Sequence, residues 1–297
     1  MRGRRDCFGA IGAAIGVAAG GAPAMAQSAW SRLPGEFARI ERSQGGRLGV
    51  AVLDTGGRRA AEHRGGDRFP MASTFKMLLG GAVLARIDAG QDSLERRIRF
   101  GRGDLVTYSP ATEGQAGGEG MTVAALLEAM MTLSDNTAAN LLLSAIGGPE
   151  GLTAFLRRHG DAVTRLDRME PALNEGTPGD PRDTTSPAAM LATMRALTLG
   201  EALSAPSRAR LVWLMEGNRV SGSLFRARLP QGWRIGDRSG AGGFNTRGIA
   251  AVIWPSGGRA PLLVTAYLTE GPQRTLAARD AVLAEVGGAI FAAYGAG

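Results

Sequence analysis

The spacing of apolar and polar residues changes several times along the chain, and each change predicts a different element. Residues 47–54 alternate apolar and small side chains and run into a Gly-Gly turn, which predicts a strand with a partner strand at 59–63. Further strands, separated by glycine-rich turns, are predicted at 233–239, 248–254 and 262–268. Helical spacing predicts helices at residues 31–43, 73–89, 122–133, 137–145, 149–158, 186–197, 205–217 and 273–294. We expect Ser73 to be the N-cap of the second helix.

The order of these elements favours an α+β fold, α/β in the broad sense. A strand pair precedes a long helical middle and three strands follow it, so the regular βαβ alternation of a parallel sheet is absent. We therefore expect an antiparallel five-stranded sheet flanked by helices, with the first strand beside the last three, plus a mainly helical lobe. Residues 27–66 and 216–297 would form the α/β lobe, and residues 67–215 an all-helical lobe that includes a long loop at 165–183.

The N-terminus has the composition of an export signal. A basic start precedes a short apolar run, and Ala24-Met25-Ala26 is typical of a cleavage site. We expect residues 1–26 to be a signal peptide that is removed after Ala26, which places the mature chain in the bacterial periplasm with no membrane segment. Arg4-Arg5 also resembles a twin-arginine signal, so the twin-arginine and the general export routes both stay open.

Composition argues against several classes of site. The formal charge of +7 is spread along the chain without a basic run interleaved with aromatic residues, so we expect no nucleic-acid partner. The single cysteine, Cys7, lies in the predicted signal, and the two histidines, His63 and His159, are far apart in sequence. A zinc site or a Ser-His-Asp triad therefore has little to build on. We expect a monomer without metal or cofactor, whose hydrolytic chemistry relies on Ser, Lys and carboxylates.

One lysine, Lys76, stands among 34 basic residues, and the other 33 are arginine. Arginine can replace lysine as a charge or a hydrogen-bond donor, but it cannot release its proton near neutral pH. Lys76 is therefore a candidate for a site that needs a deprotonatable amine. Chance survival of a single lysine explains the count equally well.

Three short motifs occur where the predicted structure suits catalysis. Ser73-Thr74-Phe75-Lys76 places a hydroxyl and an amine one helical turn apart, near a helix N-terminus whose N–H groups can stabilise an oxyanion. Ser134-Asp135-Asn136 lies between two predicted helices, where Ser and Asn also serve as ordinary caps. Asp237-Arg238-Ser239-Gly240 ends a predicted strand, where glycine is also common in simple turns. Each motif alone thus has a structural interpretation.

In this order the three motifs reproduce the signature of penicillin-recognising serine enzymes. Residues 165–174, Arg-Leu-Asp-Arg-Met-Glu-Pro-Ala-Leu-Asn, resemble the Ω loop of class A serine β-lactamases, and the likeness continues through residues 178–185. The chain is accordingly identified as similar to that class from about residue 30 onward, and its Arg-Ser-Gly motif most resembles that of carbenicillin-hydrolysing members. In the family, an ion pair at the positions of Arg168 and Asp183 closes the neck of the loop; otherwise this would be one more surface pair.

The resemblance implies a chemical role for each matching residue. Ser73 would attack the lactam carbonyl, with either Lys76 or Glu170, acting through a water, as the base. The backbone N–H groups of Ser73 and Ala241 would hold the oxyanion, and Ser134 would pass a proton to the leaving nitrogen. Glu170 would then activate the water that removes the acyl group.

The same resemblance implies the substrate contacts. Asn174 would help Glu170 to hold the water, Asn136 would bind the amide of the substrate side chain, and Tyr108 would form one wall of the site. Four residues would bind the substrate carboxylate. Three lie at the end of the predicted strand, Arg238, Ser239 and Gly240, and the fourth is the nearby Arg247.

These roles imply hydrolysis of penicillins, including carbenicillin, through a short-lived acyl-enzyme, and hence antibiotic resistance. Two other functions stay open. A penicillin-binding D,D-peptidase would share Ser73, Lys76 and Ser134 but would keep penicillin as a stable adduct, because it lacks the water site at Glu170. A non-catalytic β-lactam sensor would acylate and signal, usually from a membrane segment.

Overall fold

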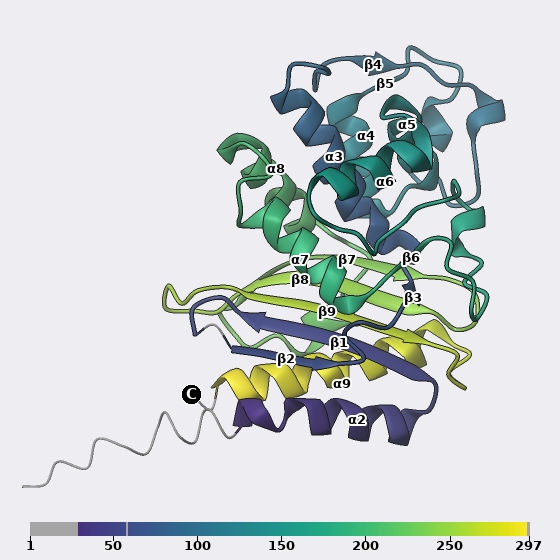
Figure 1. Cartoon of the computed structure of the whole chain (residues 1–297). Helices are drawn as coiled ribbons and strands as arrows, with labels where there is room; N and C mark the ends of the chain where they lie inside the picture. Colours follow the sequence, from purple (N-terminus) through teal and green to yellow (C-terminus); the bar gives the residue numbers. More distant parts are fainter. Residues whose placement is uncertain (1–28, 58, 296–297) are drawn as a thin grey trace, which may run out of the picture.

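A computed structural model describes residues 29–57 and 59–295, and an antiparallel five-stranded sheet crosses its middle (Figure 1). The strand order is β2-β1-β9-β8-β7. The strands are β1 (Arg47–Asp54), β2 (Arg59–His63), β7 (Arg234–Ala241), β8 (Arg247–Trp254) and β9 (Leu262–Thr269). The predicted sheet is confirmed, since β1 pairs with β9 along its whole length although the helical middle of the chain separates them.

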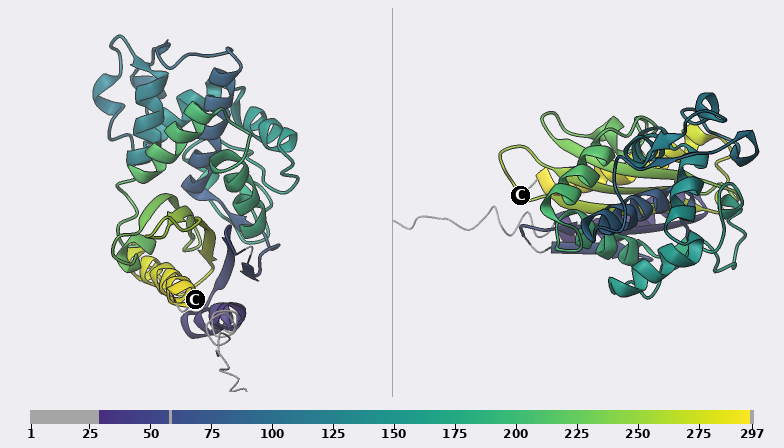
Figure 2. Two further views of the ribbon diagram at one scale, coloured as in Figure 1. Left: turned by 90° about the vertical axis from the view of Figure 1, so that its left-hand side faces the viewer. Right: turned by 90° about the horizontal axis from the view of Figure 1, so that it is seen from above.

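Helices cover both faces of the sheet, as the views in Figures 1 and 2 show. One face carries α2 (Leu33–Gln44) and α9 (Leu276–Gly295), the two ends of the described chain. The other carries α3 (Phe75–Asp88), α4 (Val123–Leu133), α5 (Asn136–Ala145), α6 (Gly148–Arg158), α7 (Pro187–Thr198) and α8 (Ala205–Glu216). Short elements complete this side: β3 (Phe69–Pro70) with β6 (Thr184–Thr185), β4 (Arg97–Ile98) with β5 (Met121–Thr122), and the 3-10 turns η1 (Ala72–Thr74), η2 (Arg102–Asp104), η3 (Glu113–Gln115), η4 (Ala172–Asn174) and η5 (Phe225–Arg228).

The sheet separates two hydrophobic cores, and β8 shows how the sequence serves both. Ile249, Ala251 and Ile253 face the core formed with α2 and α9, whereas Ala250 and Val252 face the core of the larger helical group. Side chains alternate between the two faces of a strand, so a strand buried on both faces needs a continuous apolar run. This explains why residues 248–254 lack the polar alternation of a half-exposed strand.

Some predicted boundaries shift by a few residues for local reasons. The seventh strand runs two residues past the predicted end, to Ala241, and Trp233 lies outside it. Thr122 and Asp135 are the N-caps of α4 and α5, because their side chains accept the free backbone N–H groups of Ala125 and Ala138.

The predicted signal peptide, residues 1–26, lies outside the described residues. Within the residues that the structure describes, no helix is both long enough and apolar enough to span a membrane.

Candidate active site

Ser73 lies in the 3-10 turn η1, immediately before α3, and not at the N-cap position that the sequence suggested. The correction has a local cause. Ala72 has a positive φ of 41°, and both Thr74 N and Thr74 Oγ1 donate to Met71 O, so the chain winds one tight turn before α3 begins at Phe75. The Ser73 hydroxyl therefore does not bond to a helix N–H but points to Glu170, with 3.4 Å between Ser73 Oγ and Glu170 Oε1.

Lys76 is fully buried in the first turn of α3. Its Nζ donates to Asn136 Oδ1 at 2.6 Å, to Ser134 O at 2.9 Å and to Ser134 Oγ at 3.3 Å, and it lies 3.1 Å from Glu170 Oε1. Burial lowers the pKa of Lys76 to about 8, although the neighbouring Glu170 carboxylate opposes the change. Ser73 and Lys76 are thus linked through Glu170 Oε1, which both side chains contact.

Glu170 is buried in the loop that precedes η4, and two asparagines hold it. Asn140, on α5, donates Nδ2 to Glu170 O and accepts from Glu170 N through Oδ1, both at 2.9 Å. Asn174 donates Nδ2 to Glu170 Oε2 at 2.5 Å, while its buried Oδ1 has no protein partner. The Glu170 carboxylate is therefore fixed beside the amide oxygen of Asn174, which is free to accept a hydrogen bond.

A dense set of charges closes the neck of the loop at 165–183. Arg168 Nε lies 2.6 Å from Asp183 Oδ2, and Asp183 Oδ1 accepts the backbone N–H groups of Asp167 and Arg168. Asp167 in turn accepts Asp183 N at 3.0 Å. Because Asp183 is almost fully buried and its carboxylate accepts backbone N–H groups as well as Arg168, this contact differs from an ordinary surface ion pair.

The Ser134-Asp135-Asn136 segment joins α4 to α5 and points two of its side chains at Lys76. Ser134 has a positive φ of 64°, which ends α4 and turns the chain. Asp135, which sequence reasoning left without a role, caps α5 and also accepts the N–H groups of Ala111 and Thr112 at 2.9 Å. It thereby fixes the loop that contains Ala111 and Thr112. Tyr108, in the same loop, has a 54% exposed side chain, and its backbone carbonyl accepts Asn136 N.

The end of β7 passes directly beside the Ser73 turn. A Cβ at Gly240 would lie 2.7 Å from Ser73 N and 2.9 Å from Met71 O, so only glycine permits this approach. The next residue, Ala241, is exposed at the strand end, and Ser239 is buried with its hydroxyl 3.4 Å from Val220 O. Gly240 is therefore part of the strand, and its missing side chain is what brings β7 and the nucleophile together.

The two arginines expected at this edge have different surroundings. Arg238 is fully buried, donates to Ser134 Oγ through NH2, and has its pKa lowered to about 10 by burial. Arg247, on β8, donates to Gly240 O at 3.1 Å and forms a buried ion pair with Asp280 at 2.5 Å. Asp280 lies on α9, 33 positions after Arg247, and no sequence motif marked it.

Comparisons with known proteins agree with this geometry. A family profile described as the β-lactamase enzyme family matches residues 32–294. Solved structures of an ancestral class A β-lactamase of Gram-negative bacteria are similar to the chain: one is 59% identical, covering 88% of this chain and 99% of that chain with a TM-score of 0.86. A putative class A β-lactamase, PenP from Rhodopseudomonas palustris, is 54% identical, covering 88% and 99% with a TM-score of 0.85.

The chain belongs to the class A β-lactamases. Membership in this class of β-lactam-hydrolysing enzymes decides against the D,D-peptidase and the non-catalytic sensor. It also accounts for the fold, since the five-stranded antiparallel sheet with its helices is shared with these structural neighbours.

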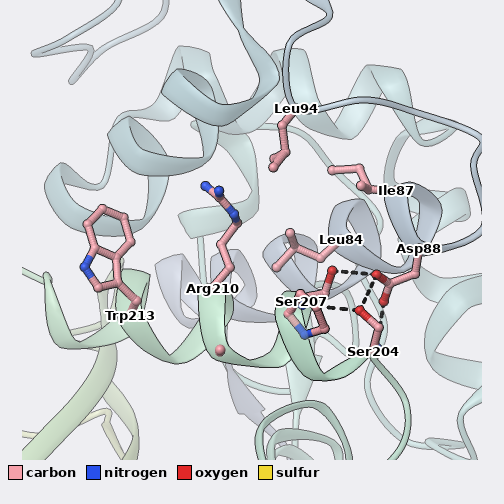
Figure 3. Close-up of a pocket in the computed structure, with 10 residues that line it drawn as sticks. Leu84, Ile87, Asp88, Leu94, Ser204, Ser207, Arg210 and Trp213 are labelled. Carbon is pink, nitrogen blue, oxygen red and sulfur yellow. Dashed lines mark hydrogen bonds between the residues drawn. The ribbon is translucent and has the colours of Figure 1, made fainter.

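A pocket of about 600 Å³ in this β-lactamase lies between α3 and α8, and no candidate site residue lines it (Figure 3). Its apolar wall includes Leu84, Ile87 and Trp213. At one end Asp88 accepts from the N–H and hydroxyl of Ser204 and from the hydroxyl of Ser207 (Figure 3). These bonds tie the end of α3 to the start of α8, and the opposite end of α3 follows directly on the Ser73 turn.

Among the described residues, no group of three or more His, Cys, Asp or Glu side chains is arranged to hold a metal ion. The site residues to which sequence reasoning gave no role are polar positioning groups: Asn140 and Asp280, which lie outside the motifs, and Asp135, which lies inside one. Each binds a partner 23 or more positions away in the sequence, so no short motif could have contained the pair.

Proposed function

We propose that this β-lactamase hydrolyses penicillins, including carbenicillin, through an acyl-enzyme on Ser73 that a Glu170-activated water resolves. The observation that carries the proposal is the position of Glu170 Oε1, which lies within 3.4 Å of Ser73 Oγ and 3.1 Å of Lys76 Nζ in a buried setting. One carboxylate thus touches both the nucleophile and the only lysine. The free acceptor of Asn174 beside it supports a water position at this carboxylate.

In the first half-reaction, Ser73 Oγ attacks the lactam carbonyl carbon while its proton passes to Lys76 or, through a water, to Glu170. The carbonyl oxygen becomes an oxyanion beside the backbone N–H groups of Ser73 and Ala241. The C–N bond then breaks, and Ser134 passes a proton to the nitrogen. Support for that proton path comes from the bond between Lys76 Nζ and Ser134 Oγ.

In the second half-reaction, Glu170 takes a proton from water, the water oxygen attacks the ester carbonyl, and Ser73 leaves with a proton restored. Arg238, Ser239 and Arg247 bind the substrate carboxylate, Asn136 binds the side-chain amide, and Tyr108 borders the substrate. Arg238 is the stronger candidate of the two arginines for the anion, because Asp280 already neutralises Arg247. The Arg-Ser-Gly motif supports inclusion of carbenicillin among the substrates.

The test separates acylation from deacylation by mass spectrometry of intact protein after mixing with benzylpenicillin. Glu170→Ala should accumulate protein carrying one penicilloyl group, whereas Ser73→Ala should carry none. Glu175→Ala, which removes a glutamate from the same loop without touching Ser73, is the matched control and should turn over without accumulation. Unimpaired turnover by either Glu170→Ala or Ser73→Ala would refute the mechanism.

We further propose that residues 1–26 direct export to the periplasm and that the mature enzyme acts there as a monomer. Its two lobes would comprise residues 27–66 with 216–297, and residues 67–215. Edman sequencing of the secreted protein, with an expected start at Gln27, and sedimentation of that protein test the cleavage site and the oligomeric state.

A further inference from the structure

Asn218 is a 94%-buried residue between α8 and β7 whose side-chain amide makes four hydrogen bonds. Its Nδ2 donates to Asp237 Oδ1 at 2.9 Å and to Ser221 Oγ at 3.0 Å. Its Oδ1 accepts from Val220 N at 3.1 Å and from Arg238 NH1 at 3.3 Å. The amide therefore lies between a buried anion and a buried cation, and every hydrogen-bonding position that it offers in the plane is used.

The chemistry of these neighbours fixes which way the amide points. A guanidinium can only donate and an ionised carboxylate can only accept, so the amide oxygen must face Arg238 and the nitrogen must face Asp237. Reversing the amide would oppose donor to donor and acceptor to acceptor. Asn218 thus holds the Arg238 guanidinium in one orientation, with its NH2 directed at Ser134 Oγ.

The charges on the two sides of Asn218 are balanced differently. Asp237 forms an ion pair with Arg226, with 3.0 Å between Asp237 Oδ1 and Arg226 NH2. Arg238, in contrast, has no carboxylate within 4.0 Å among the residues that the structure describes, and its buried Nε has no hydrogen-bond partner. Fully buried cations are normally paired, because leaving water without a counter-ion is costly. Arg238 therefore has no carboxylate in contact with it and keeps one unused donor.

We propose that Asn218 is a positioning and specificity residue of this enzyme: its neutral amide stands where a counter-ion would stand, orients the Arg238 guanidinium, and leaves that charge for the carboxylate of the substrate. The inference rests on the proposed role of Arg238 in binding this carboxylate. It adds that the identity of residue 218 determines how much of the Arg238 charge the substrate receives. An apolar residue at this position would leave Arg238 NH1 without a partner and free to turn away.

The test compares benzylpenicillin with its methyl ester, which lacks the carboxylate but keeps the lactam ring. We expect Asn218→Ala to lower kcat/KM for benzylpenicillin about tenfold, as loss of one hydrogen bond to a charged group implies, mainly through KM. The same variant should change kcat/KM for the ester less than about twofold, because the ester does not use the Arg238 charge. The ratio of the two values is formed within one preparation, so partial unfolding cancels from it.

Ser221→Ala is the matched control, because it removes a buried partner of Asn218 and Asp237 without touching Arg238. It should leave the acid-to-ester ratio of the wild-type enzyme unchanged. Asn218→Ser, whose shorter side chain cannot reach both charged neighbours, replaces Asn218→Ala if that variant does not fold. An equal fall for acid and ester in the Asn218 variant, or the same fall in the ratio for Ser221→Ala, would overturn the inference.

Arg238→Gln separates this inference from the proposed function. If Arg238→Gln abolishes the preference for the acid while Asn218→Ala leaves it intact, the role of Arg238 stands and that of Asn218 is refuted. If Arg238→Gln leaves the preference intact, the proposed carboxylate site itself is wrong and the role of Asn218 falls with it.

Discussion

Removing the side-chain amide of Asn140 should slow deacylation, and it should slow acylation much less where Lys76 is the acylation base. Asn140 binds both backbone polar groups of Glu170, the N–H and the C=O, each at 2.9 Å. It therefore fixes the residue that is proposed to activate the deacylating water. The Ser73 turn is built separately, from bonds between Thr74 and Met71, so Asn140→Ala leaves the nucleophile in place.

The magnitude follows from the two lost hydrogen bonds. Each contributes about 1 kcal/mol, so Asn140→Ala costs roughly 2 kcal/mol of the free energy that holds Glu170 in position. Since 1.4 kcal/mol is tenfold in a rate or equilibrium, deacylation should slow by about 10- to 30-fold. If Lys76 is the base that takes the Ser73 proton, acylation should change by less than about threefold, because Ser73 and Lys76 keep their own supports; if Glu170 is that base, acylation should slow along with deacylation.

Rapid-quench mixing with benzylpenicillin, followed by mass spectrometry of the intact protein, measures both rate constants. Thr153→Ala is the matched control, because Thr153 also makes two hydrogen bonds with the backbone of this loop, to Leu166 N at 3.0 Å and to Leu166 O at 3.1 Å. It should reduce stability comparably but slow deacylation much less. If Thr153→Ala slows deacylation as much as Asn140→Ala does, general loosening of the loop is the cause and the specific role of Asn140 is refuted.

Three further predictions concern the buried cations Lys76 and Arg238 and the close approach of Gly243 to Glu175. Because burial lowers the pKa of Lys76 to about 8, the unfolded chain binds more protons between about pH 8 and 10.5, so the free energy of unfolding should rise with pH in that window relative to Lys76→Met; urea titrations showing parallel curves would contradict this. Arg238→Lys should change the ratio of carbenicillin to benzylpenicillin turnover more than it changes thermal stability, and an unaltered ratio would exclude a specificity role. Gly243→Ala should lower stability by about 1–3 kcal/mol and slow deacylation, because its Cβ would lie 2.1 Å from Glu175 O; Gly222→Ala, with open space around it, is the control in thermal unfolding and kinetic assays.

The strands and helices could be predicted because their signals are local. The alternation in residues 47–54 and the helical spacing in residues 75–88 are complete within each element, and the structure has both. The first turn before α3 could not be predicted in the same way. Ser73 has the residue type of an N-cap, but the positive φ of Ala72 and the bonds to Met71 O decide the turn, and neither is visible in residue type alone.

In the candidate site, too, the residues that could be predicted are those with a local signal in the sequence. Residues within short motifs, such as Ser73, Lys76 and Ser134, are brought together as the motif order suggested. Asn140 and Asn218 were missed, because each acts through partners about 20 to 30 positions away and a single asparagine has no recognisable pattern around it. Even the Ser73–Lys76 pair is connected through Glu170, 97 positions after Ser73, so its geometry depends on tertiary structure that spacing cannot encode.

Lys76 and Arg238 are two buried cations of one site, and the proposed mechanism asks different things of them. Burial lowers the pKa of Lys76 from 10.5 to about 8 and also lowers that of Arg238, to about 10. Near neutral pH the lysine can therefore exchange its proton, while the arginine keeps its charge. An arginine at position 76 could not release a proton near neutral pH, whereas either basic residue can supply the charge that binds an anion at position 238. A cation on the surface does not need to release its proton, so arginine can serve there. The single lysine among 34 basic residues therefore has a physical reason to be at position 76.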